Sequence, residues 1–509
     1  MKMRGMMQRS NGLFSRIITL FLIPLIVVVV DGFNEEGGDH KMRLELVHRH
    51  DARVLGEVDQ VEAIKGFLQR DNIRRQRMNQ RLYGNDDNNN NHYDKRRKEW
   101  ETLESQPQMA MHSGRDYGLG EYFVEVKVGT PGQSFWLAAD TGSEFTWLNC
   151  ARVNGSKSGG VHRQHRGRAR SRNRRRTRPR ARSNNVNDPC NGVFCPHRSA
   201  SFEPVTCSSE KCKVDLSDLF SLTQCPKPSD PCLYDISYAD GSSAKGFFGT
   251  DTIALSLTNG KEGKLHNLTI GCTQSMQNGV AFTQDTGGIL GLGYAKDHFV
   301  DKAALQYGAK FTYCLVDHLA HKNVSSYLTI GGQLKVNLLS EIKRTELVLL
   351  APFYGVNVLG ISIGDKMLNI PPQIWDFNAQ GGAIIDSGTT LTALVTAAYD
   401  PVFDALSKSL TNVKRVTGDF GVMEFCFEAE GFDVSVVPRL VFHFAGGSRL
   451  EPPVKSYIID VAPEIKCIGI VAIKGKSGAS VIGNIMQQDH LWEFDLAQNT
   501  VGFAPSACT

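Results

Sequence analysis

Two tetrapeptides of the same pattern constrain the fold of this chain more than any other feature. Asp140-Thr141-Gly142-Ser143 and Asp386-Ser387-Gly388-Thr389 each consist of an acid, a hydroxyl residue, a glycine and a second hydroxyl residue. Apolar residues lead into both, starting at Phe135 and at Ala383. Such runs predict strands that end in tight turns. Two of these turns predict one site that brings two carboxyl groups together; the alternative is a pair of unrelated Asx turns.

Strand-like patterns dominate the sequence after residue 120. Apolar and polar residues alternate from Tyr122 to Val128 with the period of a β-strand, and a turn-forming Gly-Thr-Pro-Gly sequence follows. Similar short apolar runs recur to the end of the chain, whereas helical patterns are few, among them Thr396–Leu410. We therefore predict a mainly all-β protein.

The two halves also share a second element. A short apolar sequence bounded by glycine follows the first acid at Gly288–Gly291, and a comparable one follows the second acid at Ser480–Asn484. The chain has 509 residues, which is more than one ordinary core needs. The repetition predicts two similar lobes that face each other, with the two acids at their interface.

The cysteines divide the chain into two regions. All 12 lie between Cys150 and Cys508, and the first 149 residues contain none. An even number in this distribution predicts a disulfide-bonded, oxidised mature part behind a cysteine-free leader. Buried thiols or a zinc site are the alternatives, but pairs such as Cys207 and Cys212 lack the Cys-x-x-Cys spacing of zinc sites. We predict no metal site and no cofactor.

The leader itself has two parts. Residues 1–33 combine a basic start with the apolar stretch Ile17–Val30, which is typical of a signal peptide, with a retained signal anchor as the alternative. Residues 34–110 are charged and are interpreted as a prosegment and linker. Their basic residues are expected to cover an acidic cleft at neutral pH and to leave when the cleft carboxylates become protonated.

One basic segment distorts the net charge. Eleven arginines and no acids lie between Arg163 and Arg182, and without them the net charge changes from +4 to −7. We interpret the run as a surface loop within a Cys-rich, Arg-rich insertion at about 150–232. Nucleic-acid binding through phosphate contacts is the alternative. The run contains no aromatic residues that could stack on bases, so we expect no nucleic-acid partner.

Several further motifs accompany the acid loops, and together they resemble the pepsin-type aspartic proteases, specifically the nepenthesin-like group of plants. The resemblance extends over about residues 40–509 and implies a bilobal fold with a cleft between an N-terminal lobe at 111–345 and a C-terminal lobe at 346–509. Its motifs include Glu121-Tyr122-Phe123, Gly129-Thr130-Pro131, Tyr238–Ser242, Gly291-Leu292-Gly293, Tyr313-Cys314-Leu315 and Ile482-Gly483-Asn484.

The resemblance implies a role for each site residue. Asp140 and Asp386 would be the catalytic pair, and the other residues of the two loops would support them: Thr141, Gly142, Ser143, Ser387, Gly388 and Thr389. Tyr238 and Gly241 would belong to a flap that closes over the substrate, with Trp147 as the hydrogen-bond partner of Tyr238. The sequence departs from the family at Ala239, where glycine is common.

The cysteine order of the family implies six disulfides. They are Cys150–Cys190, Cys195–Cys272, Cys207–Cys232, Cys212–Cys225, Cys314–Cys508 and Cys426–Cys467. Sequons for N-glycosylation occur at Asn154, Asn267 and Asn323, as expected of a secreted protein.

Together these features predict a secreted zymogen of an aspartic endopeptidase with an acidic pH optimum. Its partners would be protein or peptide substrates, and the mature form would be a monomer without a membrane span. The expected destination is the extracellular space or cell wall, or the vacuole or another compartment supplied by the secretory pathway. The alternative is a catalytically inactive pepsin-like protein that acts as a glycosidase inhibitor or binding protein.

Overall fold

The computed structural model describes most of the chain after residue 106. The described residues are 107–113, 120–151, 190, 192–217, 225–237, 243–277, 287–319, 326–332, 338–473 and 478–508, together with Asp71, Arg75, Met78, Asn79 and Leu82 of the leader. The expected signal peptide, the arginine run 163–182 and the flap residues 238–242 lie outside them.

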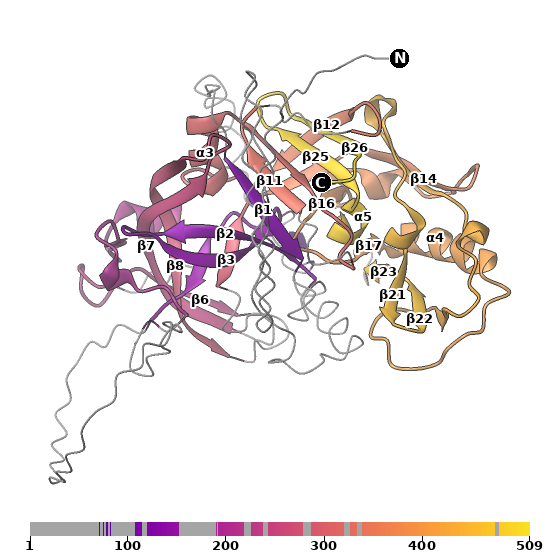
Figure 1. The fold of residues 1–509 in the computed structure, drawn as a ribbon, viewed down its shortest axis with the longest axis horizontal. Helices are drawn as coiled ribbons and strands as arrows, with labels where there is room; N and C mark the ends of the chain where they lie inside the picture. The colour runs from indigo at the N-terminus through magenta and orange to yellow at the C-terminus, as the bar shows by residue number, and fades with distance from the viewer. Residues whose placement is uncertain are drawn as a thin grey trace, which may run out of the picture. The chain divides into compact units, whose positions relative to one another are not determined.

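A run of antiparallel strands joins the two halves of the chain. Each neighbouring pair in this run is hydrogen-bonded, and Figure 1 shows several of its strands together near the centre of the view. In spatial order the strands are β2 (Tyr122–Val128), β1 (Gln108–Ser113), β11 (Ser326–Ile330), β10 (Lys310–Cys314), β25 (His490–Asp495), β26 (Thr500–Pro505) and β12 (Lys343–Leu350).

The contact between β10 and β25 is the joint between the halves. Phe311 of β10 lies opposite Phe494 of β25 in the strand register, and their rings stack with centroids 4.6 Å apart and planes 6° apart. Both side chains are buried. A residue from the first half and one from the last twenty residues therefore share one core, because the large hydrophobic cluster of the molecule includes both.

The first half threads its acid-bearing strand between two others. β3 (Gln133–Asp140) pairs antiparallel with β2 and parallel with β9 (Gly288–Gly291), while β4 (Trp147–Asn149) pairs antiparallel with β9 and parallel with β8 (Glu262–Gln277). The remaining strands of this half are β5 (Glu203–Pro204), β6 (Leu233–Ser237) and β7 (Ser243–Ser256).

The second half repeats this arrangement. β16 (Ala383–Ile385) pairs antiparallel with β13 (Phe353–Val356) and parallel with β24 (Ser480–Ile482), while β17 (Thr392–Val395) pairs antiparallel with β24 and parallel with β23 (Ile470–Ile473). The predicted repeat of an acid loop followed by an apolar strand is therefore confirmed, as are the β-rich class and the bilobal plan.

The other elements of the second half surround these strands. Two small sheets contain β15-β14-β19-β20 and β18-β22-β21. Their bounds are β14 (Val358–Ile363), β15 (Lys366–Met367), β18 (Cys426–Glu428), β19 (Leu440–Phe444), β20 (Arg449–Leu450), β21 (Ile458–Ala462) and β22 (Ile465–Ile468). Short helical turns of the 3-10 or π type are η3 (Pro196–Arg198), η4 (Lys211–Asp215), η6 (Pro372–Trp375), η7 (Phe377–Ala379), η8 (Val434–Val436), η9 (Ala445–Gly447) and η10 (Val454–Ser456).

The described α-helices number three outside the leader. They are α3 (Phe299–Tyr307), α4 (Thr396–Ser409) and α5 (Asn484–Gln487). α4 buries Ala398, Val402 and Leu406, which recur every four residues and therefore form one apolar face. This is the helix that the sequence pattern predicts at Thr396–Leu410.

The disulfides correct four of the six predicted pairings. The pairs Cys314–Cys508 and Cys426–Cys467 are confirmed. The predicted Cys150–Cys190, Cys195–Cys272, Cys207–Cys232 and Cys212–Cys225 are wrong. The structure instead forms Cys150–Cys272, Cys190–Cys195, Cys207–Cys225 and Cys212–Cys232.

The exchange occurs within two groups of neighbouring cysteines. Cys150 follows β4, which runs parallel to the segment of β8 that contains Cys272. The backbone of Cys150 also forms an isolated β-bridge with Phe194, the residue before Cys195. In the second group, Cys207, Cys212, Cys225 and Cys232 meet in one small core. The order of cysteines in the family assigns each cysteine to the correct group, but the partners within each group differ from those it implies.

The predicted domain boundaries at 110 and 345 stay predictions. Both positions fall inside strands, β1 (Gln108–Ser113) and β12 (Lys343–Leu350). These two strands belong to the antiparallel run that joins the halves.

Candidate active site

The carboxylate of Asp140 is fixed by its own loop. Asp140 is the last residue of β3, and the chain turns sharply after it. The Gly142 N–H donates a hydrogen bond to Oδ1 at 2.9 Å, and the Ser143 hydroxyl donates to Oδ2 at 2.7 Å. Both oxygens therefore have a donor, which sets the orientation of the carboxyl plane.

The loop of Asp386 repeats this geometry. Gly388 N–H donates to Oδ1 of Asp386 at 2.9 Å, and the Thr389 hydroxyl donates to Oδ2 at 2.5 Å. The exposed fraction is 2% for Asp140 and 0% for Asp386. Each acid thus has one backbone donor and one hydroxyl donor, and both are largely withdrawn from water.

The two loops are joined to each other through Thr141 and Ser387. Thr141 N–H donates to the Ser387 hydroxyl at 3.1 Å, and Ser387 N–H donates to the Thr141 hydroxyl at 2.8 Å. The Ser387 hydroxyl in turn donates to the Ala139 carbonyl oxygen at 2.8 Å, and the Thr141 hydroxyl to that of Ile385 at 3.4 Å. These reciprocal bonds bring together two loops that are about half the chain apart in sequence.

Glycines in the neighbouring strands allow this close packing. A Cβ atom on Gly291 would lie 2.4 Å from the carbonyl carbon of Glu144, and one on Gly483 would lie 2.6 Å from that of Leu391. Both distances are too short for any side chain. The glycine in each of the apolar sequences that follow the acids therefore lets the neighbouring backbone pack directly against it.

Two supporting residues have no assigned role in the sequence analysis. The Asn484 side chain donates to the Ser387 carbonyl oxygen at 3.0 Å and to that of Gly120 at 2.9 Å, so it ties the second loop to the segment before β2. The Tyr313 hydroxyl donates to Oε1 of Gln487 at 2.5 Å. Burial raises the pKa of Tyr313 well above its ordinary value, and the nearby Asp386 raises it further, so this hydroxyl stays protonated.

The remaining predicted residues are placed only in part. Tyr238, Gly241, Asn154 and Asn323 lie outside the described residues. Trp147 is buried in β4, in a small cluster with Phe145 and Tyr234. Asn267 is exposed on β8 with a left-handed backbone, while Thr269 of the same sequon is buried. The roles predicted for these residues stay predictions.

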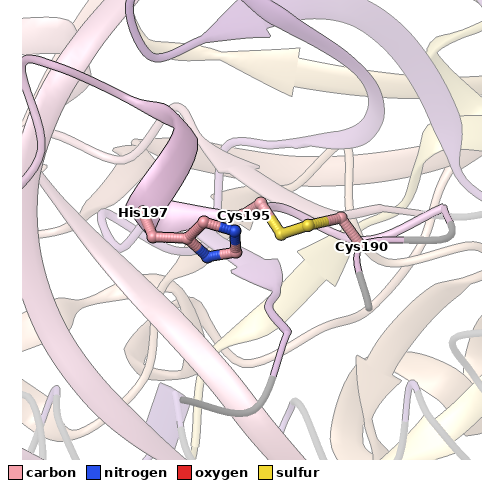
Figure 2. A group of neighbouring side chains, drawn as sticks. All are labelled: Cys190, Cys195 and His197. Atoms are coloured by element: carbon pink, nitrogen blue, oxygen red, sulfur yellow. A yellow bond between two sulfur atoms is a disulfide. The ribbon is translucent and has the colours of Figure 1, made fainter. Parts of the chain in front are cut away.

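One group of side chains has the composition of a metal site. Ligand atoms of Cys190, Cys195 and His197 lie within 4.8 Å of one another. Figure 2 shows that the two sulfur atoms are bonded to each other, as a disulfide. A metal ion needs thiolate sulfur, so this trio is not a metal centre while the disulfide is intact.

Among the described residues, no helix has the length and the apolar character that crossing a membrane requires.

Comparison with protein families matches most of the chain in two segments. Residues 122–332 match the family described as "Xylanase inhibitor N-terminal", and residues 353–505 match "Xylanase inhibitor C-terminal". The first segment contains Asp140 and the second contains Asp386, so each family covers one of the two acid loops.

Two curated relatives are named as proteases. Aspartyl protease family protein 2 of Arabidopsis thaliana is 31% identical over 404 residues, which cover 78% of this chain and 73% of that protein. Aspartic proteinase nepenthesin-1 of Nepenthes gracilis is 26% identical over 519 residues and covers 98% of this chain and 99% of that protein.

Solved structures show the same fold at lower identity. The crystal structure of edgp has a TM-score of 0.59 and 17% identity, covering 79% of this chain and 95% of that chain. Basic 7S globulin from soybean has a TM-score of 0.56 and 17% identity, covering 79% of this chain and 97% of that chain. At this identity the likeness concerns the fold alone.

Proposed function

Because this chain belongs to the pepsin-type aspartic proteases, in their nepenthesin-like plant subgroup, we propose that it is an active endopeptidase whose catalytic pair is Asp140 and Asp386. The observation that supports catalysis best is the pair of matching acid loops joined by reciprocal Thr141–Ser387 hydrogen bonds. Both carboxyl groups are buried, and their two matching loops are hydrogen-bonded to each other. Their geometry is therefore fixed before a substrate binds, as a catalytic site requires.

The proposed reaction needs no metal and no covalent intermediate. Two neighbouring carboxyl groups do not both ionise readily, so they share one proton. The ionised group takes a proton from a water molecule, whose oxygen attacks the carbonyl carbon of the scissile peptide bond, while the protonated group donates to the carbonyl oxygen. In the collapse of the tetrahedral intermediate, the acid that is now protonated donates its proton to the leaving nitrogen as the C–N bond breaks, and the acid that is now ionised takes a proton from one of the two hydroxyls. The two acids then return to their starting state.

The shared proton predicts activity under acidic conditions. We expect the purified chain, after removal of its leader, to cleave a denatured protein substrate fastest in mild acid and to lose activity toward neutral pH, because the mechanism needs a proton on one of the two carboxyls. Initial rates measured from pH 3 to pH 8 test this. Full activity at pH 8 with none at pH 4 would contradict the mechanism.

We also propose that the protein is synthesised as a zymogen in the secretory pathway. The six disulfides support an oxidising compartment, and the extracellular space, the cell wall and the vacuole are candidate destinations. Its partners would be protein or peptide substrates, and glycans would occupy the sequon asparagines. Mass spectrometry of the protein purified from a eukaryotic secretory host, with and without glycosidase treatment, would identify the mature N-terminus and any glycans.

A second candidate function follows from the description of the matching families. A pepsin-like fold without peptidase activity can serve as a binding protein, and both matching families are described as xylanase inhibitors. Intact acids in both loops favour the peptidase. An assay of the same preparation for protein cleavage and for inhibition of a xylanase separates the two functions.

Substitution Ser387→Ala is expected to lower kcat by about tenfold or more, because small displacements of catalytic groups cost large factors in rate. It removes the acceptor of the buried Thr141 N–H and the donor to the Ala139 carbonyl oxygen, which would also cost about 1–3 kcal/mol in unfolding free energy. Kinetics and urea unfolding measure both effects. As the matched control, Ser435→Ala removes a hydroxyl that bonds only to the exposed Asp433, and we expect parental values. An unchanged kcat in Ser387→Ala would contradict the role assigned to the cross-link.

A further inference from the structure

A chain of hydrogen bonds connects His318 to the first residue of β2. The side-chain amide of Gln488 donates through Nε2 to Nδ1 of His318 at 3.1 Å and to the Tyr122 hydroxyl at 2.8 Å. The Tyr122 hydroxyl in turn donates to the Val316 carbonyl oxygen at 2.5 Å. Gln488 and Tyr122 are no more than 1% exposed, whereas the His318 side chain is 19% exposed. The bonds therefore run from a residue that reaches solvent to an anchor in the core.

This arrangement requires a neutral His318. An amide nitrogen only donates, so Nδ1 of His318 is the acceptor and carries no proton. When His318 gains a proton, its Nδ1–H faces the amide nitrogen of Gln488, and two donors oppose each other. The acceptors within reach of Nδ1 are then Oε1 of Gln488 and Oδ1 of Asp317, each at 3.5 Å. The Gln488 amide must turn over to present its oxygen to the protonated ring.

The charges beside His318 favour this protonation. Nζ of Lys455 lies 2.8 Å from Oδ2 of Asp317 and 2.7 Å from Oδ2 of Asp489, so the three groups together carry one negative charge. Burial raises the pKa of Asp317, but hydrogen bonds from Lys455 and from the Leu319 N–H outweigh burial and hold that pKa below its ordinary value. Asp317 therefore stays ionised in mild acid, and a protonated His318 would balance the charge of the cluster.

Two other titratable side chains face Gln488 and keep their protonation state. Burial raises the pKa of Tyr122 well above its ordinary value, so Tyr122 remains a hydroxyl. Burial lowers the pKa of His490, which is 3% exposed and whose Nδ1 lies 3.0 Å from the Gln488 carbonyl oxygen. Histidine ordinarily changes charge between about pH 5 and pH 8. The partly exposed His318 is thus the group of this cluster that takes up a proton in mild acid.

The Tyr122 anchor lies two residues from a glycine that packs on the second acid loop. A Cβ atom on Gly120 would lie 2.3 Å from Oγ1 of Thr390, so the backbone of Gly120 lies directly against that residue. The Asn484 side chain donates to the Gly120 carbonyl oxygen at 2.9 Å and to that of Ser387 at 3.0 Å. The position of Gly120 is therefore coupled both to the Tyr122 anchor and to the second acid loop.

We propose that His318 is a proton-responsive positioning residue, whose protonation turns the Gln488 amide, releases the Tyr122 anchor and loosens the contact of Gly120 with the second acid loop. Its effect on catalysis rests on the proposed peptidase function, whereas the hydrogen-bond change does not. Once the amide has turned, its oxygen faces the Tyr122 hydroxyl, which directs its proton to that oxygen and gives up the Val316 carbonyl. The neutral form holds the loop in the geometry described above, so protonation of His318 sets an acid limit to activity.

Fluorine NMR of the full-length chain labelled with fluorotyrosine tests the hydrogen-bond change. The chain carries Asp140→Asn, which prevents self-cleavage, and Tyr122→Phe identifies the Tyr122 signal. As the pH falls from 7 to 4, we expect this signal to shift with the same midpoint as the ring nitrogens of His318 in spectra of nitrogen-labelled histidine. The shift should disappear in His318→Gln, which keeps a neutral acceptor for Gln488. It should also disappear in Gln488→Met, in which His318 still titrates.

His443→Gln is the matched control for the first of these variants. His443 is hydrogen-bonded through Nε2 to the Ser362 hydroxyl at 2.9 Å, within the small sheet that contains β14 and β19. We expect this variant to leave both the Tyr122 shift and the kinetic constants at their parental values.

The effect on catalysis is measured after removal of the leader, because Asp71 of the leader accepts hydrogen bonds from the Thr390 and Leu391 N–H groups. We expect His318→Gln to raise the ratio of kcat at pH 4 to kcat at pH 6 by about threefold or more over the parent, because the neutral side chain keeps the second acid loop in position in acid. KM should change little. A merely structural role would instead lower kcat to the same extent at both pH values.

Two NMR results would overturn the proposal: a Tyr122 signal that does not titrate with His318 in the parent, or a shift that persists in both His318→Gln and Gln488→Met. An unchanged ratio of kcat values in His318→Gln, with peptide cleavage intact, would overturn the positioning role. If no form cleaves peptide while the Tyr122 signal follows His318, the peptidase proposal fails and the hydrogen-bond change stands.

Discussion

Replacing Asp140 or Asp386 with asparagine is expected to lower kcat by about 10³-fold or more. Each acid is proposed to transfer a proton in the same step, and asparagine can neither accept nor donate that proton. The fold should persist, because an amide oxygen still accepts from the Gly142 or Gly388 N–H and the adjacent hydroxyl can rotate to accept from the amide nitrogen. Steady-state kinetics on a peptide substrate, with thermal unfolding of each variant, measure both quantities.

The control for this pair is Asp365→Asn, which alters a 99% exposed carboxylate that pairs with Arg439. We expect its kcat and Tm to equal those of the parent. The two loop variants should also lose activity to a similar degree, since the hydrogen bonds around the two acids correspond one to one. Cleavage by either loop variant at a rate within tenfold of the parent would rule out the catalytic pair.

Removing the Cys314–Cys508 disulfide, by replacing both residues with serine, is expected to cost about 5 kcal/mol in unfolding free energy. The bond closes a loop with a sequence separation of 194 residues, and the loss of unfolded-chain entropy grows with the length of the loop that is closed. Both cysteines are buried, at the end of β10 and near the C-terminus. Urea and thermal unfolding of the oxidised proteins would measure the change.

The Cys190–Cys195 disulfide provides a matched control with the same chemistry. Its sequence separation is 5, so the same relation gives only about 2 kcal/mol when both residues are replaced with serine. We therefore expect the first variant to be less stable than the second by about 3 kcal/mol. Equal losses would show that loop length is not what determines the contribution of these bonds.

The acid loops could be predicted from the sequence because their determinants are local. Asp, a hydroxyl residue and glycine in succession favour the turn by themselves, and the apolar residues before them favour the strand. The same holds for β2, whose alternating pattern from Tyr122 to Val128 matches the observed strand. The repetition of these local features was enough to predict two similar halves.

The disulfide partners and the leader contacts could not be predicted in the same way, because they depend on tertiary packing. Cys150 lies close to both Cys195 and Cys272 only after β4 has aligned with β8. Asp71 is the one acid among five arginines between residues 70 and 81, and the sequence drew attention to the arginines. Its importance follows from burial against the Thr390 and Leu391 N–H groups, which no local pattern indicates.

The pairing of β10 with β25 has a consequence for synthesis of the protein on the ribosome. β25 begins at His490, and β24, which backs the Asp386 loop, begins at Ser480, so both emerge well over a hundred residues after β10. Until then β10 is paired only with β11, and the second acid loop lacks its backing strand. The Asp386 loop therefore cannot reach its full packing before residues 480–482 are synthesised, and such late, long-range strand pairing is also expected to make folding slow. The proposed proteolytic activity would therefore appear only after residues 480–505 have been synthesised.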